Sequence, residues 1–352
     1  MRPMSYMENS VYKEDIEHVV SERNIPWDKL AGKRILMTGG TGVIGNVLVH
    51  SLLRADEKYH LHCGIRLVLR NLEKAKEIFG EALERMEIIE ADVAELPPSI
   101  GAADYIIHAA SMTASNAFIE QPVETIRTNL SGTMQLLELA REQGCENFVY
   151  LSTMEVYGAV HSDEKIKEAQ PLVTDSFSVR NSYPISKIMC ESLCRSYASE
   201  YGVRTSVIRL TQTFGAGVPY DDNRVFAEFA KHAKEKNDIV LKTKGETRRS
   251  YLYTSDAARA ILTVMLKGKT DGAVYNAANE ETYCTIAEMA ELVAGMHGAR
   301  VKYDLSASAE TLGYAPVVRV NLDTGKLKRL GWKADVVLEE TYSRLVGFWD
   351  GK

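Results

Sequence analysis

The fold is decided by the stretch Arg34-Ile-Leu-Met-Thr-Gly-Gly-Thr-Gly-Val-Ile-Gly45. It begins with an apolar, β-prone run, continues through a glycine-rich turn and ends in a helical pattern. Gly39, Gly42 and Gly45 have the spacing G-x-x-G-x-x-G. Glycines at such a turn let the backbone approach a pyrophosphate, which the free N–H groups and positive end of the following helix can bind. The stretch therefore predicts a strand, a phosphate-binding turn and a helix that together hold a dinucleotide.

Strands and helices alternate along the chain after this stretch. Apolar β-prone runs occupy residues 34–37, 65–69, 87–90, 105–107, 148–151 and 206–210, and helical patterns occupy residues 45–54, 123–143 and 183–201. Alternation of this kind predicts βαβ crossovers and a parallel sheet that is covered on both faces. The expected fold class is α/β, a Rossmann-like doubly wound parallel sheet with a smaller C-terminal substrate-binding lobe.

Three regions are expected from these patterns. Residues 1–30 are predicted to form an N-terminal helical extension, with a helix at 11–24. Residues 31–210 are predicted to form the NAD(P)-binding Rossmann domain, with return segments near 250–277. Residues 211–352 are predicted to be mostly the substrate-binding lobe.

Composition narrows the classes of partner. The chain has 352 residues, 45% hydrophobic and 26% charged, with a formal net charge of -6. A mildly acidic chain gains nothing from a phosphate backbone, so no nucleic-acid partner is expected. The sequence has no apolar run long enough to span a bilayer and no secretory signal pattern, so no membrane partner is expected. Its five dispersed cysteines suggest reduced thiols and a cytoplasmic location, and no metal site is predicted because nothing completes the Cys190 and Cys194 pair.

The second and third strands end in residues suited to the adenosine half of the cofactor. The acidic residue usual about 20 positions after the glycines is missing, and Leu69-Arg70-Asn71 follows instead. Arg70 could pair with a 2′-phosphate and favour NADP, or it could stack on adenine or face solvent. Asp92 is placed to accept from the adenine amino group. The choice between NAD and NADP stays open at this point.

A pair of side chains on one helical face indicates the chemistry. Tyr183 and Lys187 are four residues apart. A phenol with a pKa near 10 is a poor base, so a neighbouring cation, together with a positive nicotinamide, is expected to lower its pKa. Thr153 ends an upstream strand and can hydrogen-bond an oxygen that becomes a carbonyl. Asn129, on the intervening helix, can orient a water or the backbone beside the site.

Further motifs occur in the same order along the chain. They are Asp92-Val93, His108-Ala-Ala110, Asn129-Leu-Ser-Gly132, Ser152-Thr-Met-Glu-Val-Tyr-Gly158, Tyr183-x-x-x-Lys187 and Arg249-Ser-Tyr-Leu-Tyr-Thr-Ser-Asp256. The set resembles the NAD-dependent epimerase/dehydratase family of extended short-chain dehydrogenases, over about residues 32–290.

The resemblance implies a catalytic Thr153, Tyr183 and Lys187, a nucleoside-diphosphate sugar as substrate, and Arg249 at the substrate diphosphate. It implies NAD as cofactor, with contacts from the three glycines and from Val43, Ile44, Arg70, Asp92, Val93, Ala109, Ala110 and Asn129. It also implies a homodimer, since related enzymes commonly dimerise through two long helices.

The triplet Thr153-Met154-Glu155 carries the finer information. Sugar 4,6-dehydratases of the family resemble T-D-E here, UDP-glucuronate decarboxylases resemble T-S-E, and simple 4-epimerases usually lack the Glu. A thioether cannot donate a proton, so ordinary 4,6-dehydration is not expected. Glu155 is either a base beside a 4-keto carbon or a structural carboxylate. Gln212 stands where the family usually has an Asn near the substrate phosphate.

The predicted function is therefore that of an NAD(P)-dependent nucleotide-sugar epimerase acting through a transient 4-keto intermediate. The alternatives are a dehydratase or a UDP-glucuronate-type decarboxylase of the same family, and an NADP-dependent ketoreductase that releases its oxidised cofactor. A non-catalytic, cofactor-sensing protein is a further alternative, and the intact Thr153, Tyr183 and Lys187 argue against it.

Overall fold

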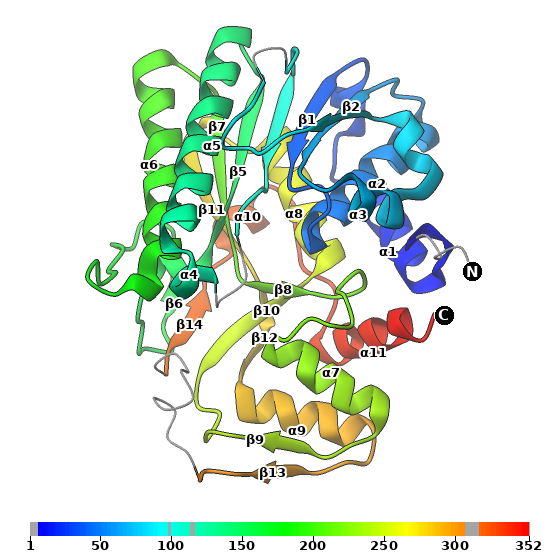
Figure 1. The fold of residues 1–352 in the computed structure, drawn as a ribbon, viewed down its shortest axis with the longest axis vertical. Coiled ribbons are helices and arrows are strands. Elements are labelled where there is room, and N and C mark those ends of the chain that lie inside the picture. The colour runs from blue at the N-terminus through cyan, green and yellow to red at the C-terminus, as the bar shows by residue number, and fades with distance from the viewer. Residues whose placement is uncertain (1–5, 98–99, 113–116, 307–316, 352) are drawn as a thin grey trace.

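The large sheet has seven parallel strands in the order β11-β7-β5-β4-β1-β2-β3 (Figure 1). The computed structural model describes residues 6–97, 100–112, 117–306 and 317–351. The strands of this sheet are β1 Arg34–Thr38, β2 Gly64–Leu69, β3 Glu87–Glu90, β4 Tyr105–His108, β5 Asn147–Thr153, β7 Thr205–Leu210 and β11 Asp271–Ala277. The sheet confirms the predicted Rossmann-like α/β fold class.

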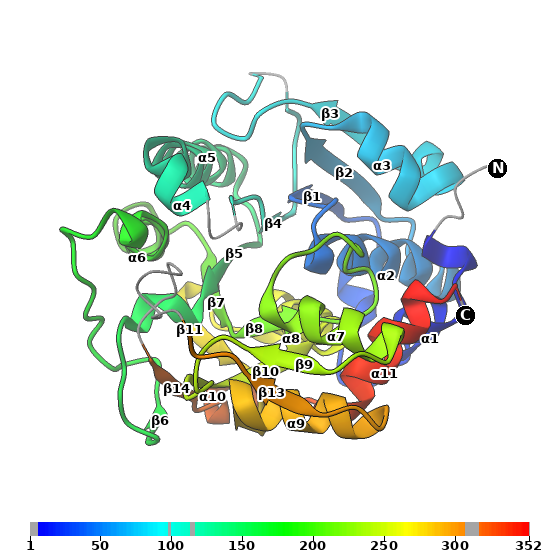
Figure 2. The same ribbon diagram turned by 60° about the horizontal axis from the view of Figure 1, so that its bottom comes forward.

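Helices cover both faces of this sheet, which is why its strands have apolar residues facing both sides (Figure 2). Ile35 and Met37 of β1 pack into one core, and Leu36 between them packs into the other. The first core is shared by α2 Val43–Tyr59, α3 Leu72–Phe79 and α8 Thr254–Lys267. The second is shared by α5 Pro122–Gln143 and α6 Ser182–Tyr201, and the short α4 Ala117–Glu120 precedes α5.

The N-terminal helix is shorter than the sequence pattern predicts. It was expected at residues 11–24, and α1 spans Ser10–Val20. The Asn9 side chain caps it by accepting from the N–H of Tyr12, and the helix ends at Ser21. Its apolar side, which includes Ile16 and Val19, lies in the core shared with α2 and α8.

A second sheet lies beyond the carboxyl edge of the large one. Its strands run in the order β12-β10-β14-β6, and β8 pairs with β10. They are β6 Lys165–Ile166, β8 Gln212–Phe214, β10 Arg248–Tyr253, β12 Asn279–Thr285 and β14 Arg319–Leu322. The short strand β6 therefore pairs outside the large sheet, although it lies within the 31–210 range predicted for the Rossmann domain.

The remaining elements form the smaller lobe, drawn at the bottom of Figure 1, and the segments that connect it to the large sheet. The lobe contains α7 Val225–Glu235 and α9 Ile286–Met296, with a two-stranded sheet of β9 Ile239–Leu241 and β13 Val301–Tyr303. The other helices are α10 Gly325–Lys328 and α11 Leu338–Trp349, with short 3-10 turns at η1 Tyr6–Glu8, η2 Trp27–Leu30, η3 Gly80–Arg85, η4 Met154–Tyr157 and η5 Val179–Asn181.

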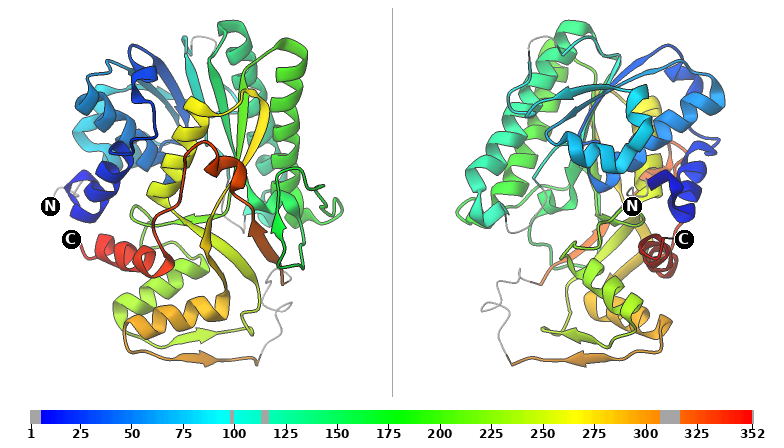
Figure 3. Two further views of the ribbon diagram at one scale, coloured as in Figure 1. Left: turned by 180° about the vertical axis from the view of Figure 1, so that it is seen from behind. Right: turned by 45° about the vertical axis from the view of Figure 1, so that its right-hand side comes forward.

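The two ends of the chain lie side by side (Figure 3). Asp15 of α1 accepts from Arg344 of α11 at 2.7 Å and from the hydroxyl of Tyr253, at the end of β10, at 2.5 Å. These buried contacts tie α1 to the second sheet and to the last helix. Among the described residues, no helix combines the length and apolar character needed to cross a membrane.

Candidate active site

The glycine-rich turn fills the space between the end of β4 and the start of α2. Gly39 has a φ of 73°, and a Cβ on it would lie 2.6 Å from the carbonyl carbon of Ala109. A Cβ on Gly45 would collide with the carbonyl oxygen of Gly39. Gly42 differs, because it is exposed, its φ of -77° is ordinary, and its Cβ would lie 3.3 Å from the nearest atom. Packing therefore requires glycine at positions 39 and 45, whereas a side chain at position 42 would meet only the Gly39 carbonyl oxygen, at 3.3 Å, and open surface.

The first turn of α2 is free to bind an anion. Gly42 caps this helix without any side-chain hydrogen bond, and the half-buried Val43 and Ile44 follow it. The first N–H groups of a helix have no intrahelical acceptors, and the helix dipole is positive there. The turn and helix start thus offer backbone donors beside open surface, the arrangement that a pyrophosphate needs.

The end of β4 is held by a buried chain of hydrogen bonds. His108 Nδ1 lies 2.8 Å from Thr38 Oγ1, and its Nε2 lies 3.1 Å from Thr133 Oγ1. The Thr38 hydroxyl also accepts from the N–H of Ala110 at 3.1 Å. Burial lowers the pKa of His108 to about 3, with the charge of Lys187 acting in the same direction, so His108 is a neutral structural residue.

Thr153 and Tyr183 meet where β5 ends and α6 begins. The Tyr183 ring stacks on Phe118, with centroids 4.3 Å apart and planes at 4°. Burial and the charge of Glu155 raise the pKa of Tyr183, and a hydrogen bond with Thr153 opposes them. The predicted lowering of the phenol pKa by a neighbouring cation together with a positive nicotinamide stays a prediction, because in the protein alone burial outweighs the opposing groups.

Lys187 lies one turn after Tyr183 and faces the same site. Its ammonium donates to the carbonyl oxygen of Leu151 at 2.8 Å. It lies 4.7 Å from the ring centroid of Tyr150 and 5.7 Å from that of Tyr183. Burial lowers the pKa of Lys187 to about 8. The ammonium is therefore held near the Tyr183 ring, with a pKa below that of an exposed lysine.

Glu155 has a partner that the sequence pattern did not reveal. Arg180 donates to Glu155 Oε2 from both terminal nitrogens, at 3.1 and 3.2 Å. Its guanidinium also lies 5.0 Å from the ring centroid of Phe118, the residue stacked on Tyr183. The only signal in the sequence was that Arg180 lies three residues before Tyr183. Its contact with Glu155 could not be predicted, because Arg180 lies in an irregular segment without periodicity. Arg180 and Phe118 are thus the two site neighbours that sequence reasoning missed.

Asn129 joins α5 to the first turn of α6. Its amide nitrogen donates to Ser186 Oγ at 2.8 Å, and its amide oxygen accepts from Ser111 Oγ at 2.8 Å. Ser186 in turn donates to the carbonyl of Tyr183 at 2.8 Å. Both ends of this buried amide are therefore engaged in holding the helix that carries Tyr183, and a direct contact of Asn129 with the cofactor stays a prediction.

Met154, the middle residue of the triplet, has an environment that does not suit proton transfer. It is buried in a small apolar cluster, and its sulfur accepts from Thr211 Oγ1 at 3.2 Å. Gln212 on β8 pairs with Tyr251, two residues along β10 from Arg249. The Nε of Arg249 is buried without a hydrogen-bond partner among the described residues. Gln212 and Arg249 therefore lie on adjacent strands of the second sheet, whereas Thr153 and Tyr183 lie on elements of the large sheet and its covering helices.

The predicted adenosine contacts lie together at the ends of β2 and β3. Arg70 Nη1 lies 3.6 Å from Asp92 Oδ2, and both side chains are largely exposed. Asp92 Oδ1 also accepts from the N–H of Ala94 at 2.8 Å, while Val93 is buried in the α5–α6 core. The positive charge of Arg70 is thus partly offset by Asp92.

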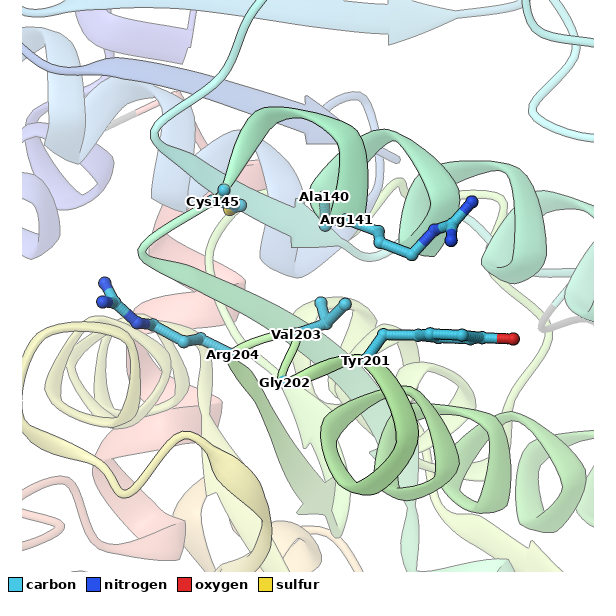
Figure 4. A pocket seen from close by; sticks show the side chains of 8 residues that line it. Ala140, Arg141, Cys145, Tyr201, Gly202, Val203 and Arg204 are labelled. Atoms are coloured by element: carbon cyan, nitrogen blue, oxygen red, sulfur yellow. The ribbon is translucent and has the colours of Figure 1, made fainter.

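A hollow of ≈ 200 Å³ lies at the opposite edge of the sheet (Figure 4). It is formed where α5 and α6 end and where β5 and β7 begin, and it is lined by Ala140, Arg141, Gly144, Cys145, Tyr201, Gly202, Val203 and Arg204. Thr153 stands at the other end of β5, so this hollow is not part of the site.

Comparison with known proteins agrees with this geometry. Residues 35–278 match the model of the NAD dependent epimerase/dehydratase family. UDP-glucuronic acid decarboxylase 6 of Arabidopsis thaliana is 29% identical over 304 residues, covering 82% of this chain and 85% of its own. The UDP-glucose 4-epimerase of Thermotoga maritima, solved with UDP-glucose, has a TM-score of 0.75 at 24% identity, covering 90% of this chain and 98% of its own. The dTDP-glucose 4,6-dehydratase of Streptomyces venezuelae, solved with NAD, has a TM-score of 0.76 at 24% identity, covering 90% and 97%.

Proposed function

The chain belongs to the NAD-dependent epimerase/dehydratase family, and from that membership we propose that it epimerises a nucleoside-diphosphate sugar through a transient 4-keto intermediate. One observation carries the proposal: Thr153, Tyr183 and Lys187 converge at the carboxyl edge of the sheet that carries the glycine-rich turn. Ligands of doubly wound folds bind at this edge. Oxidation of a hydroxyl beside a nicotinamide needs a base for the hydroxyl proton and a donor to the forming carbonyl, and these three groups can supply both.

The residues at the turn fit NAD. Gly42 and the first N–H groups of α2 suit the pyrophosphate, and the small Ala109 and Ala110 leave room at the end of β4. We assign the adenosine half to Asp92 and Arg70, and their proximity favours NAD over NADP because a 2′-phosphate would meet the Asp92 carboxylate. When bound beside Tyr183, NAD would supply the hydride acceptor, and in its reduced form the hydride donor, for C4 of the sugar.

In this proposal Tyr183 removes the proton from the C4 hydroxyl while Thr153 donates a hydrogen bond to the same oxygen. The burial that raises the pKa of Tyr183 makes the phenol a poor base in the protein alone. Positive charge is therefore required beside it, and Lys187, fixed by the Leu151 carbonyl, supplies part of that charge together with the oxidised cofactor. The ketone then either rotates and is reduced on its opposite face, or a neighbouring carbon loses a proton to Glu155 and regains a proton on its other face before C4 is reduced.

The residue between Thr153 and Glu155 argues against dehydration. A 4,6-dehydratase needs an acid to protonate the departing hydroxyl. Met154 is buried, its sulfur accepts from Thr211, and a thioether has no proton to give. Epimerisation needs no such acid, so it is the net reaction that we favour.

Decarboxylation of a uronic acid is the second candidate, and Arg180 favours it. Its guanidinium, bound to Glu155 beside the stacked Phe118 and Tyr183, is suited to a substrate carboxylate. The Arabidopsis relative is named as a UDP-glucuronic acid decarboxylase. Both candidates share the oxidation at C4 and differ in the fate of the ketone.

We assign the diphosphate of the substrate to Arg249 and Gln212. The unpartnered Nε of Arg249 is a buried donor that a phosphate oxygen would satisfy. Gln212 lies on the neighbouring strand β8. The solved epimerase and dehydratase, which have the same fold, contain a UDP-sugar and a nucleotide, respectively.

We also propose a homodimer formed through α5 and α6. Apolar side chains are exposed along both helices, among them Val123 at 71% and Met134 at 47% on α5, and Met189 at 52% on α6. Two neighbouring helices with outward apolar residues are suited to pack against the same helices of a second copy.

The test is incubation with a panel of UDP-, dTDP-, CDP- and GDP-sugars, followed by chromatography and mass spectrometry. Epimerisation gives unchanged mass with a changed retention time, and the cofactor stays bound and is returned to its oxidised form at the end of each turnover. Loss of carbon dioxide selects the decarboxylase, and loss of water selects a dehydratase. Release of oxidised NADP with net reduction of the sugar selects a ketoreductase.

A further inference from the structure

A buried ion pair lies directly behind the catalytic residues. Glu191 Oε2 accepts from Arg209 Nη2 at 2.6 Å, and Glu191 Oε1 accepts from Arg209 Nε at 3.0 Å. The side chains are 7% and 5% exposed, respectively. A buried pair carries a large desolvation cost, and apolar replacements are often as stable. The pair therefore calls for a reason other than stability, and its contacts supply one.

The carboxylate of Glu191 links the two elements that carry the proposed catalytic residues. Glu191 lies on α6, one turn after Lys187 and two turns after Tyr183. Its Oε1 also accepts from Ser152 Oγ at 2.5 Å, and Ser152 is the residue before Thr153. A slide of α6 along β5 would break these bonds, so the carboxylate fixes the distance between Thr153 and Tyr183.

Arg209 anchors the same carboxylate to the rest of the sheet. It lies opposite Ser152 on one neighbouring strand and opposite Asn276 on the other. Its Nη1 donates to the hydroxyl of Tyr157 at 2.8 Å, and that hydroxyl donates to Asn276 Oδ1 at 2.7 Å. The planar guanidinium thus joins α6 to η4, the turn that follows Thr153.

This chain of hydrogen bonds continues from Asn276 into the second sheet. Asn276 Nδ2 donates to the carbonyl of Ile166 in β6 at 2.9 Å and to that of Asp323, just after β14, at 3.2 Å. Polar groups buried together in this way are rigid when every partner is satisfied. The catalytic elements and two strands of the second sheet are therefore held in one arrangement.

We propose that Glu191, held by Arg209, is a positioning residue that sets the spacing of Thr153 and Tyr183 and maintains the charge of Lys187. This inference rests on the proposed function, because it assigns Glu191 a part in that reaction. Neither residue touches the reacting atoms in this account, so both act through their neighbours.

The surroundings of Lys187 support the role of charge. Burial lowers its pKa, while Cys190, Glu191 and Cys194 on α6 oppose that change. The other groups that face it are the rings of Tyr150 on β5 and Tyr183 on α6, and His108 on β4, whose pKa burial lowers to about 3. Glu191 is thus the carboxylate among the described groups that opposes the loss of the Lys187 proton.

The sign of the effect is set by these charges. Without the Glu191 charge, the pKa of Lys187 falls further, and the positive charge of Arg209, no longer neutralised by a carboxylate, acts in the same direction. The protonated fraction of Lys187 at a given pH then decreases. The alkaline limb of the pH profile of kcat should move to lower pH in Glu191→Gln, whereas Ser152→Ala should leave it in place because the Glu191 charge is retained.

The experiment compares these two variants with a matched control, Asp256→Asn. Asp256 pairs with Arg259 in an equally buried ion pair on α8, on the other face of the sheet, and binds the N–H of Val336. For each variant, kcat, KM, NAD affinity and thermal unfolding are measured. We expect kcat to fall by about 10²-fold in Glu191→Gln and by about 10-fold in Ser152→Ala, as for misplacements of up to about 1 Å, with KM and NAD affinity nearly unchanged. Asp256→Asn should lose thermal stability but keep its kcat and pH profile.

Two outcomes overturn the proposal. One is wild-type kcat and an unmoved alkaline limb in folded Glu191→Gln. The other, which decides the matter if Glu191→Gln does not fold, is wild-type kcat in Ser152→Ala. Titration of Lys187 by NMR in lysine-labelled protein needs no substrate, and an unchanged titration in Glu191→Gln would refute the role of charge. Failure of the proposed function is distinct, since wild-type protein would then convert no sugar of the panel.

Discussion

Tyr183 combines a buried phenol with a ring that lies flat on Phe118, so its hydroxyl can be removed without disturbing the packing. Tyr183→Phe should keep NAD affinity and cost about 1 kcal/mol of stability, the usual contribution of one hydrogen bond. Turnover should fall by about 10²–10⁴-fold, the contribution of a general acid–base group. Tyr197→Phe, on the same helix with its hydroxyl on Glu138, is the matched control and should keep full activity. Steady-state kinetics decide the point, and more than about half of wild-type turnover in Tyr183→Phe would remove it from the mechanism.

Glu155 is the residue whose role separates the candidate reactions. If it takes a proton from a carbon beside the 4-keto group, turnover in D₂O should place deuterium at C3 or C5 of the product. Glu155→Gln keeps the shape and an acceptor for Arg180 but cannot take a proton, so exchange should be suppressed while oxidation at C4 survives. Product free of deuterium, made by Glu155→Gln at the wild-type rate, would leave Glu155 as the structural partner of Arg180 and the enzyme as a simple 4-epimerase.

The candidate site could be predicted from the sequence only where a motif fixes the geometry. Thr153 follows a strand and Tyr183 opens a helix, so parallel topology alone brings them to the same edge. Arg180 and Phe118 were missed because they lie in short, irregular elements whose positions depend on tertiary contacts. The burial that raises the pKa of Tyr183 in the protein alone could not be predicted either, since burial is a property of the folded chain.

Within the glycine-rich turn, different glycines serve packing and cofactor binding, so substitutions can distinguish the two roles. Gly45→Ala should cost about 1–3 kcal/mol, because its Cβ meets the Gly39 carbonyl and the turn must shift. Gly42→Val should cost at most about 1 kcal/mol, the loss of a favourable N-cap residue, and yet abolish NAD binding by filling the exposed space. Thermal unfolding and calorimetric titration with NAD measure both effects. Normal NAD affinity in folded Gly42→Val would show that the turn is structural only.

Helices and strands were easier to predict from the sequence when they were longer and had a clear apolar periodicity. Six of the seven strands of the large sheet and the helices α2, α5 and α6 have apolar runs or faces, and their ranges were predicted to within a few residues apart from the end of α2, whereas β11 was predicted only as part of the return segments. The second sheet was not foreseen, because β6, β8 and β14 are two to four residues long and pair with strands far away in sequence. Such short strands are selected by their partners rather than by their own pattern.

At the scale of the whole molecule, the outer faces of α5 and α6 decide the assembly. Burying each large apolar side chain contributes about 1.5–3 kcal/mol, so a glutamate at such a position should weaken a dimer strongly. The double variant Met134→Glu, Met189→Glu should be monomeric by analytical ultracentrifugation where the wild type is dimeric. Val240→Glu, an equally exposed apolar position on β9, should leave the dimer intact. A dimeric double variant, or a monomeric wild type, would contradict the proposed interface.

We propose that this molecule oxidises a nucleotide sugar at C4 with a cofactor it retains, and an isotopic label at that carbon follows the oxidation itself. Nucleotide sugars of the panel are prepared with deuterium at C4 and incubated in ordinary water, and the product and the denatured protein's cofactor are analysed by mass spectrometry and NMR. We predict that the deuterium is retained in the product without exchange into water and that reduced, deuterated NAD is recovered during turnover. Conversion with unlabelled cofactor throughout, or with the C4 deuterium lost to water, would contradict the account.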